Sequence, residues 1–192
     1  MNNEKSNNLQ PVLNSVYEII KTITFVLLAA FIIRTFLIQP FVVEGQSMEP
    51  NFHNQEYLIV EKVLYRLNDP KRGDVIIFQA PSNPDFDYIK RIIALPGEKI
   101  KIVNNSVYVN NIKINESYLD KNELTLINQN ENSILERVMG PNEYFVLGDN
   151  REHSSDSREF GALPKSKIIG HVWVTVYPWK NFGTVSAENY GL

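Results

Sequence analysis

The chain of 192 residues contains no cysteine. This absence excludes disulfide bonds, thiolate nucleophiles and cysteine-ligated zinc. A domain of this size can form a hydrophobic core without disulfides, so the lack of cysteine fits either side of a membrane. The composition is otherwise that of a globular protein, with 43% hydrophobic and 21% charged residues, which excludes a disordered or fibrous chain.

The chain also lacks dense positive charge, phosphate-binding glycine loops and metal-binding spacings. Its formal net charge is -3 and no basic block runs along it, which argues against a nucleic-acid partner. No two of the three histidines, His53, His153 and His171, have the spacing of a metal site. We therefore expect no metal and no cofactor.

The same shortage of histidine argues against a Ser-His-Asp triad. His53 and His153 lie in polar segments typical of loops, and His171 follows Gly170 at the start of an expected strand. None of the three stands in a motif that supports catalysis. We interpret all three as structural or surface residues, so a serine nucleophile in this chain needs a different base.

Long apolar runs are absent except near the N-terminus, where Val16 to Ile38 has the sequence VYEIIKTITFVLLAAFIIRTFLI. The uncharged run between Lys21 and Arg34 is twelve residues long, shorter than the roughly 20 residues of a spanning helix. Lysine and arginine near helix ends can place their charges at the interface, so residues 17–38 are long enough to span. We expect a short N-terminal tail over residues 1–16 and a transmembrane anchor over residues 17–38.

Two alternatives for this apolar segment are a cleaved signal peptide and a buried helix of a soluble protein. No small-x-small cleavage site follows the run, which favours retention as an anchor. Lys5 and Lys21 precede the run and Arg34 follows it. This bias favours a cytoplasmic N-terminus, with residues 39–192 outside the cytoplasm.

From Phe41 onward, short runs of β-branched and aromatic residues alternate with turn residues, a pattern typical of a mainly β domain. Asn104-Asn105 and Asn110-Asn111 are expected hairpin turns, because asparagine tolerates positive φ. Pro178-Trp179 is expected to end a strand, and residues 104–142 are expected to form an accessory β excursion. The expected strands are Tyr57–Val60, Asp74–Gln79, Tyr88–Ala94, Lys99–Val103, Ser106–Val109, Glu143–Leu147 and Ile168–Tyr177.

The candidate nucleophile is Ser47, in the segment VEGQSMEPN directly after the apolar run. A nucleophilic serine needs a tightly held turn with backbone N–H groups near the developing oxyanion. Gly45 and Pro50 are residue types that build such turns. The motif alone is weak, and the alternative is an ordinary turn that enters a strand.

Lys90 is the candidate base, because it lies within the strand-forming segment DYIKRII. Burial disfavours the ammonium form, and a lysine whose pKa falls toward neutrality can accept the serine proton. The alternative is that strand alternation points Lys90 toward solvent. A third segment, Gly148 to Arg158 (GDNREHSSDSR), has acids and arginines at spacings that favour an ion-pair network, and serines that could present a hydroxyl to a neutral lysine.

Together these segments resemble the bacterial type I signal peptidases, the membrane-bound Ser-Lys proteases that release exported proteins from their signal peptides. The single anchor and the modest length are similar to the compact Gram-positive form. The resemblance implies a mainly β fold, with an antiparallel β-sheet catalytic domain after one N-terminal transmembrane helix and an apolar edge that lies on the membrane. Its boxes are, in order, Gly45 to Pro50, Arg72 to Val75 (RGDV), Tyr88 to Gly97 and Gly148 to Arg158.

The resemblance also implies roles for single residues. Ser47 matches the nucleophile and Lys90 the general base. Ser154 matches the serine that hydrogen-bonds and orients the lysine, while Asp156 and Arg158 match supporting ion-pair positions.

Three further positions complete this comparison with the family. Met48 matches a residue that lines the site. Gly45 stands where some members carry a serine hydroxyl as a second oxyanion donor, so that donor is absent or replaced here. Asn51 stands where threonine is frequent.

The expected function is removal of N-terminal signal peptides from exported preproteins after Ala-x-Ala-like sites, by acyl transfer at Ser47. The expected partners are signal peptides and the phospholipid membrane, with the chain as a single-pass protein of the cell membrane. One alternative is a soluble Ser-Lys autoprotease of the SOS-repressor type, which would carry a DNA-binding domain. Another is a catalytically silent anchored peptide-binding protein, which would be expected to lack Ser47 or Lys90.

Overall fold

The computed structural model describes residues 9–63, 65, 68–120, 123–127 and 133–191. The chain divides into two compact units, Met1–Ile38 and Gln39–Leu192. The first half of the expected N-terminal tail, residues 1–8, lies outside the described residues.

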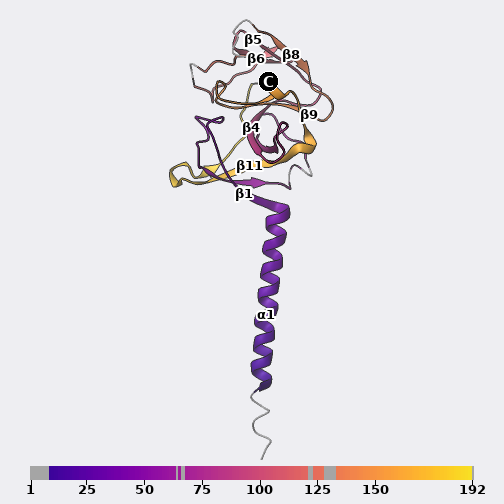
Figure 1. The fold of residues 1–192 in the computed structure, drawn as a ribbon, viewed down its shortest axis with the longest axis vertical. Coiled ribbons are helices and arrows are strands. Elements are labelled where there is room, and N and C mark those ends of the chain that lie inside the picture. The colour runs from indigo at the N-terminus through magenta and orange to yellow at the C-terminus, as the bar shows by residue number, and fades with distance from the viewer. Residues whose placement is uncertain (1–8, 64, 66–67, 121–122, 128–132, 192) are drawn as a thin grey trace, which may run out of the picture. The chain divides into compact units, whose positions relative to one another are not determined.

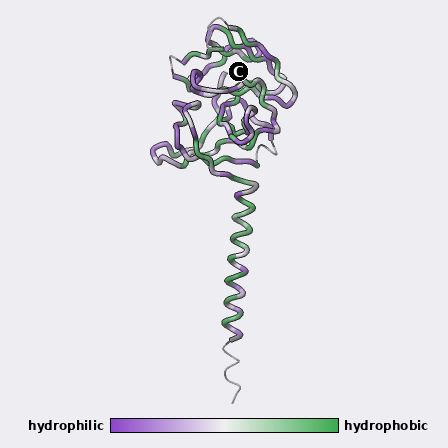
Figure 2. Tube along the Cα trace, in the orientation of Figure 1, coloured by the Kyte–Doolittle hydropathy of each residue, from purple (hydrophilic) through white to green (hydrophobic). Residues whose placement is uncertain are grey.

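The described part of the first unit is one long helix, α1 (Leu9–Ile32), continued by a π-helical turn, η1 (Ile33–Leu37) (Figure 1). The helix begins earlier than the anchor expected over residues 17–38. Pro11 fits its first turn, where a backbone N–H has no intrahelical partner. Gln10–Ile32 is long and apolar enough to cross a membrane, and Figure 2 shows hydrophobic residues along much of it.

The second unit is built from two antiparallel sheets, which confirms the predicted fold class (Figure 1). The larger sheet has the order β1 (Ile38–Val42), β2 (Tyr57–Glu61), β11 (Ile168–Tyr177), β3 (Val75–Gln79), β4 (Asp87–Ala94), β9 (Glu143–Leu147) and β10 (Leu163–Pro164), and β12 (Gly183–Thr184) pairs with β11. The smaller sheet has the order β7 (Ile112–Lys113), β6 (Ser106–Val109), β5 (Lys99–Val103) and β8 (Leu135–Val138). The short helical elements are α3 (Ser157–Phe160), η2 (Lys165–Lys167) and η3 (Trp179–Asn181).

All seven expected strands are present, each with bounds within one residue of those predicted. The two asparagine pairs have positive φ, at 48° and 56° for Asn104-Asn105 and at 51° and 68° for Asn110-Asn111, which confirms both hairpin turns. Strand β1 was not predicted, because it contains Pro40 at the edge of a sheet and directly continues the apolar run. Strand β8 was not predicted because it lies in a polar stretch and is largely exposed.

Strand β4 carries the centre of the core because apolar clusters pack against both of its faces. Ile89 belongs to a cluster with Met48 and Leu58. Ile93 belongs to a second cluster with the smaller sheet, and Ile92 to a third. Polar side chains on β4 are therefore held among buried apolar groups.

Candidate active site

Lys90 lies in the middle of β4 and is buried, with 3% of its surface exposed. Its strand neighbours are β3, where Ile76 stands opposite Lys90, and β9. Arg91 is equally buried, at 3%, because both faces of the strand are covered. The alternative that strand alternation points Lys90 toward solvent is therefore wrong.

Ser47 lies in a turn that is anchored in the core from its C-terminal side. Met48 is 1% exposed and Phe52 4% exposed, and the Phe52 N–H donates to the Met48 carbonyl at 2.9 Å. On the other side Gly45 has φ +93°, a conformation that favours glycine, and its N–H donates to Asn54 Oδ1 at 3.0 Å. The turn therefore holds the serine between a buried anchor and a glycine.

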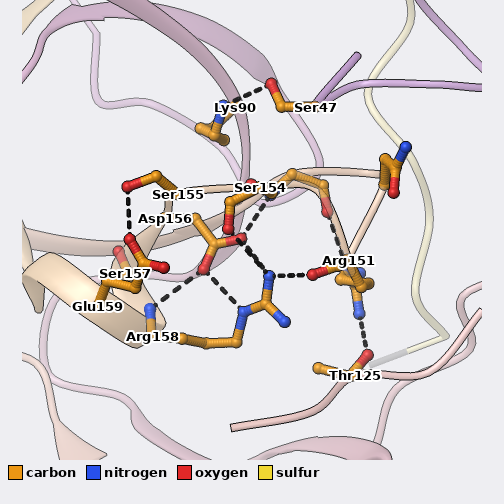
Figure 3. A network of polar contacts seen from close by, with 12 residues as sticks. Ser47, Lys90, Thr125, Arg151, Ser154, Ser155, Asp156, Ser157, Arg158 and Glu159 are labelled. Carbon is orange, nitrogen blue, oxygen red and sulfur yellow. Dashed lines mark hydrogen bonds and ion pairs between the residues drawn. The ribbon is translucent and has the colours of Figure 1, made fainter. Parts of the chain in front are cut away.

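The two candidate catalytic side chains meet, as Figure 3 shows. Lys90 Nζ lies 2.7 Å from Ser47 Oγ and 2.8 Å from the Ile89 carbonyl oxygen. The segments that carry them are far apart in the sequence, so the fold supplies this contact. A neutral amine at this distance can accept the hydroxyl proton of Ser47.

Burial lowers the pKa of Lys90 to about 8, from an ordinary value of 10.5. The carboxylates of Asp156 and Asp149 act in the opposite direction, because negative charge favours the ammonium form, whereas Arg158 lowers the pKa further. A substantial fraction of Lys90 is thus neutral at mildly alkaline pH, as a general base requires.

The loop from Gly148 to Arg158 forms the ion-pair network that its spacing predicts (Figure 3). Asp156 is fully buried. Its carboxylate accepts from Arg158 Nε at 2.8 Å, from Arg158 Nη2 at 2.8 Å and from the Gly148 N–H at 3.1 Å. Arg158 Nη2 also donates to the Arg151 carbonyl at 2.6 Å. The loop is therefore fixed from within, next to the serine turn.

Ser154 lies beside the Ser47 backbone. A Cβ added to Gly148 would come 2.2 Å from Ser154 Oγ and 2.4 Å from the Ser47 carbonyl oxygen, so position 148 has room only for glycine. That carbonyl accepts from the Asn150 N–H at 3.1 Å. Among the described residues, Ser154 Oγ is buried without a hydrogen-bond partner, so the hydrogen bond expected between Ser154 and Lys90 is not formed. The second oxygen next to Lys90 Nζ is the Ile89 carbonyl.

Sequence reasoning missed two polar supports of the site. Arg91 Nε and Nη2 bind the two carboxylate oxygens of Asp149, at 2.9 Å and 2.6 Å. Ser157 Oγ accepts from the Val146 N–H at 3.0 Å and so ties the loop to β9. An arginine within an apolar strand was the signal for the first contact, and nothing in the sequence indicated the second.

Ser47 and Lys90 line a cleft of about 380 Å³. One wall is the edge segment Phe41 to Glu44 and the other is Asp85 to Ile89. Leu58 and Ile77, which are 0% and 4% exposed, also line it. Met48 was predicted to line the site, but the described residues that line this cleft do not include it. Its side chain packs in the core beneath the turn instead. The cleft therefore combines buried apolar side chains with polar ones such as Glu44, Asp85 and Asp87, between two polypeptide segments.

The chain resembles known proteins over most of its length. Residues 16–177 match the family model described as signal peptidase, peptidase S26. A signal peptidase I of Bacillus licheniformis is 35% identical over 183 residues, which cover 93% of this chain and 96% of that protein. Signal peptidase IB of Staphylococcus aureus (strain COL) is 35% identical over 83% of this chain and 87% of its own length.

A solved structure is also similar. The crystal structure of a signal peptidase I from Enterococcus faecalis V583 matches with a TM-score of 0.43 and 30% identity, over 55% of this chain and 97% of that one. The family model and the curated relatives each cover more than two thirds of this chain. The chain therefore belongs to the signal peptidases of the peptidase S26 family, which are serine endopeptidases.

Proposed function

We propose that this enzyme removes N-terminal signal peptides from exported preproteins by acyl transfer at a Ser47-Lys90 dyad. The observation that carries the proposal is the distance of 2.7 Å between Ser47 Oγ and the buried Lys90 Nζ. A signal peptidase named for the same reaction matches almost the whole chain, which supports the substrate class.

The reaction begins when neutral Lys90 takes the Ser47 proton and Ser47 Oγ attacks the scissile carbonyl carbon. The tetrahedral intermediate collapses, the C–N bond breaks, and the Lys90 ammonium gives its proton to the leaving amine of the mature protein. Water then attacks the ester while Lys90 takes a proton from it. Collapse of the second intermediate releases the signal peptide and returns the proton to Ser47 Oγ.

Backbone N–H groups near Ser47 stabilise the oxyanion in this mechanism. Among the described residues the Ser47 N–H has no acceptor, so it is available as a donor. The Gly45 N–H is already used by Asn54, and Gly45 has no side chain to donate. The oxyanion hole of this chain therefore depends on main-chain donors.

Substrate choice follows from the shape of the cleft. An extended peptide lies between Phe41 to Glu44 and Asp85 to Ile89, where main-chain groups of both walls can pair with it. The buried Leu58 and Ile77 close the floor, so the side chains that point down must be small. This geometry supports cleavage after small-x-small sites.

Anchoring by α1 places the enzyme where its substrates are. A signal peptide held in the same bilayer meets the cleft at high effective concentration. Lys5 and Lys21 before the apolar run and Arg34 after it favour a cytoplasmic N-terminus and an extracytoplasmic catalytic unit. Because the chain has no cysteine, single cysteines introduced in either unit can be labelled from one side of intact cells to test this orientation.

Cleavage of a preprotein by the detergent-solubilised chain tests the proposed function. Mass spectrometry of the products should place the cut after an Ala-x-Ala site, and Ser47→Ala should give no product. Leucine at either alanine of the site should lower kcat/KM by at least roughly tenfold, because the floor leaves no room for it. Equal cleavage of the leucine substrates would contradict the proposed specificity, and cleavage by Ser47→Ala would contradict the proposed nucleophile.

A further inference from the structure

Asp149 joins the two segments that carry the dyad. On one side it binds the guanidinium of Arg91, the residue that follows Lys90. On the other side its Oδ2 accepts from Asn51 Nδ2 at 2.9 Å, and Asn51 lies in the turn that carries Ser47. Asp149 is 1% exposed and Arg91 3% exposed, so the ion pair at this junction is screened from water.

Asn51 donates both protons of its amide nitrogen. One goes to Asp149 Oδ2 and the other to the Tyr118 carbonyl oxygen, at 3.0 Å. Tyr118 packs its ring 4.5 Å from the Arg91 guanidinium carbon. Both acceptors therefore belong to the surroundings of Arg91, and the asparagine side chain connects these surroundings to the serine turn.

Asn51 contributes little to packing, because the residue is exposed. The core anchors of the turn are its neighbours Met48 and Phe52. These apolar anchors hold the turn against the sheet, whereas directional contacts are needed to fix it along the sheet relative to β4. Such contacts come from the Asn150 N–H, which donates to the Ser47 carbonyl, and from the Asn51 amide.

We propose that Asn51 is a positioning residue that sets the distance between Ser47 Oγ and Lys90 Nζ by fixing the serine turn to Asp149 and Tyr118. It touches neither substrate nor the reacting atoms. A hydrogen bond to a charged group contributes more than a neutral one, so the contact with Asp149 dominates. The inference rests on the proposed Ser47-Lys90 dyad.

The matched pair Asn51→Val and Asn51→Thr tests this role in the full-length detergent-solubilised enzyme. The two replacements have the same shape, but only threonine keeps a donor. We expect Asn51→Val to lower kcat roughly 10- to 100-fold, as a misplacement of about 1 Å does, with little change in KM. We expect Asn51→Thr to recover a clear part of that loss.

Two readouts separate positioning from a general loss of structure. The midpoint of the pH–rate profile should stay where it is in the native chain, because the burial of Lys90 does not involve Asn51. Exposure of Lys90 by loosening of the fold would raise that midpoint instead. Asn142→Val is the control and should keep native kcat. Asn142 is also an exposed turn residue, and among the described residues its only hydrogen bond is the one that its carbonyl accepts from the Lys165 N–H.

Native kcat in Asn51→Val, equal losses in the valine and threonine variants, or a raised pH midpoint would each overturn the positioning role. Asn51→Ala is a second donor-free variant and must show the same loss of kcat, so the test holds if valine alone misfolds. Ser47→Ala in the same series keeps the two proposals apart. Cleavage by Ser47→Ala would contradict the dyad itself, whereas an inactive Ser47→Ala with a fully active Asn51→Val would contradict only the positioning role.

Discussion

Arg91 and Asp149 form an ion pair that is almost completely buried, with Arg91 Nη2 2.6 Å from Asp149 Oδ2. Arg91 directly follows Lys90 on β4, and Asp149 lies in the loop that supports the serine turn. Both charges have lost their hydration, so each depends on the other.

Removal of one partner of this pair should therefore be far more harmful than removal of both. We expect Asp149→Leu to lower the free energy of unfolding by roughly 3–5 kcal/mol, because it leaves the Arg91 guanidinium buried and unpaired. Adding Arg91→Met should restore a large part of that loss. Urea unfolding followed by tryptophan fluorescence measures both, since Trp173 and Trp179 lie in the second unit. Additive losses in the double variant would contradict this account.

The activity should rise with pH as Lys90 loses its proton. Burial lowers the pKa of Lys90 to about 8, so kcat/KM should increase from pH 6, reach half of its maximum near pH 8 and level off about one pH unit higher. A bell-shaped or stepped profile of preprotein cleavage reports this value for the free enzyme. A rate that is constant between pH 6 and 9 would mean that Lys90 is not the base.

The same lysine should reduce stability below pH 8. Its pKa in the folded chain is lower than its ordinary value of 10.5, so folding penalises the ammonium form, and the folded chain gains stability as pH rises from about 8 to 10.5. Lys90→Met removes the penalty. We expect it to be more stable than the native chain at pH 7, by up to about 3 kcal/mol at about 1.4 kcal/mol per pKa unit. Thermal unfolding at pH 7 and pH 10.5 tests this, and the difference should shrink at the higher pH. An equal difference at both values would contradict it.

Gly73 should not tolerate a side chain, because the C-terminal segment crosses it. A Cβ at Gly73 would come 2.3 Å from the Glu188 carbonyl oxygen, and the residue has φ +87°. Gly97 has φ +80° but open space around it, so Gly97→Ala is a matched control that carries only the backbone strain, about 1–2 kcal/mol. We expect Gly73→Ala to melt well below Gly97→Ala and to expose the chain near Glu188 to limited proteolysis. Equal melting temperatures would contradict the close contact.

Local patterns were enough to predict most of the strands and both asparagine turns, because alternation and positive φ are properties of short segments. Whether Lys90 is buried could not be predicted from alternation, since both faces of β4 are covered by segments from elsewhere in the chain. The contacts of Arg91 with Asp149 and of Asn51 with Tyr118 join residues far apart in sequence. The family resemblance identified Ser47 and Lys90, but only the fold shows the contacts of Asp149 with Arg91 and Asn51 that join the two segments.

Preprotein cleavage by the native chain, Ser47→Ala and Lys90→Met, at equal concentration and with folding confirmed by thermal unfolding, tests the central claim most directly. We expect product only from the native chain, with both variants slower by at least roughly 1000-fold, because nucleophile and base act as one unit. Near-native cleavage by a folded Lys90→Met would contradict the dyad, whatever the distance between the two side chains.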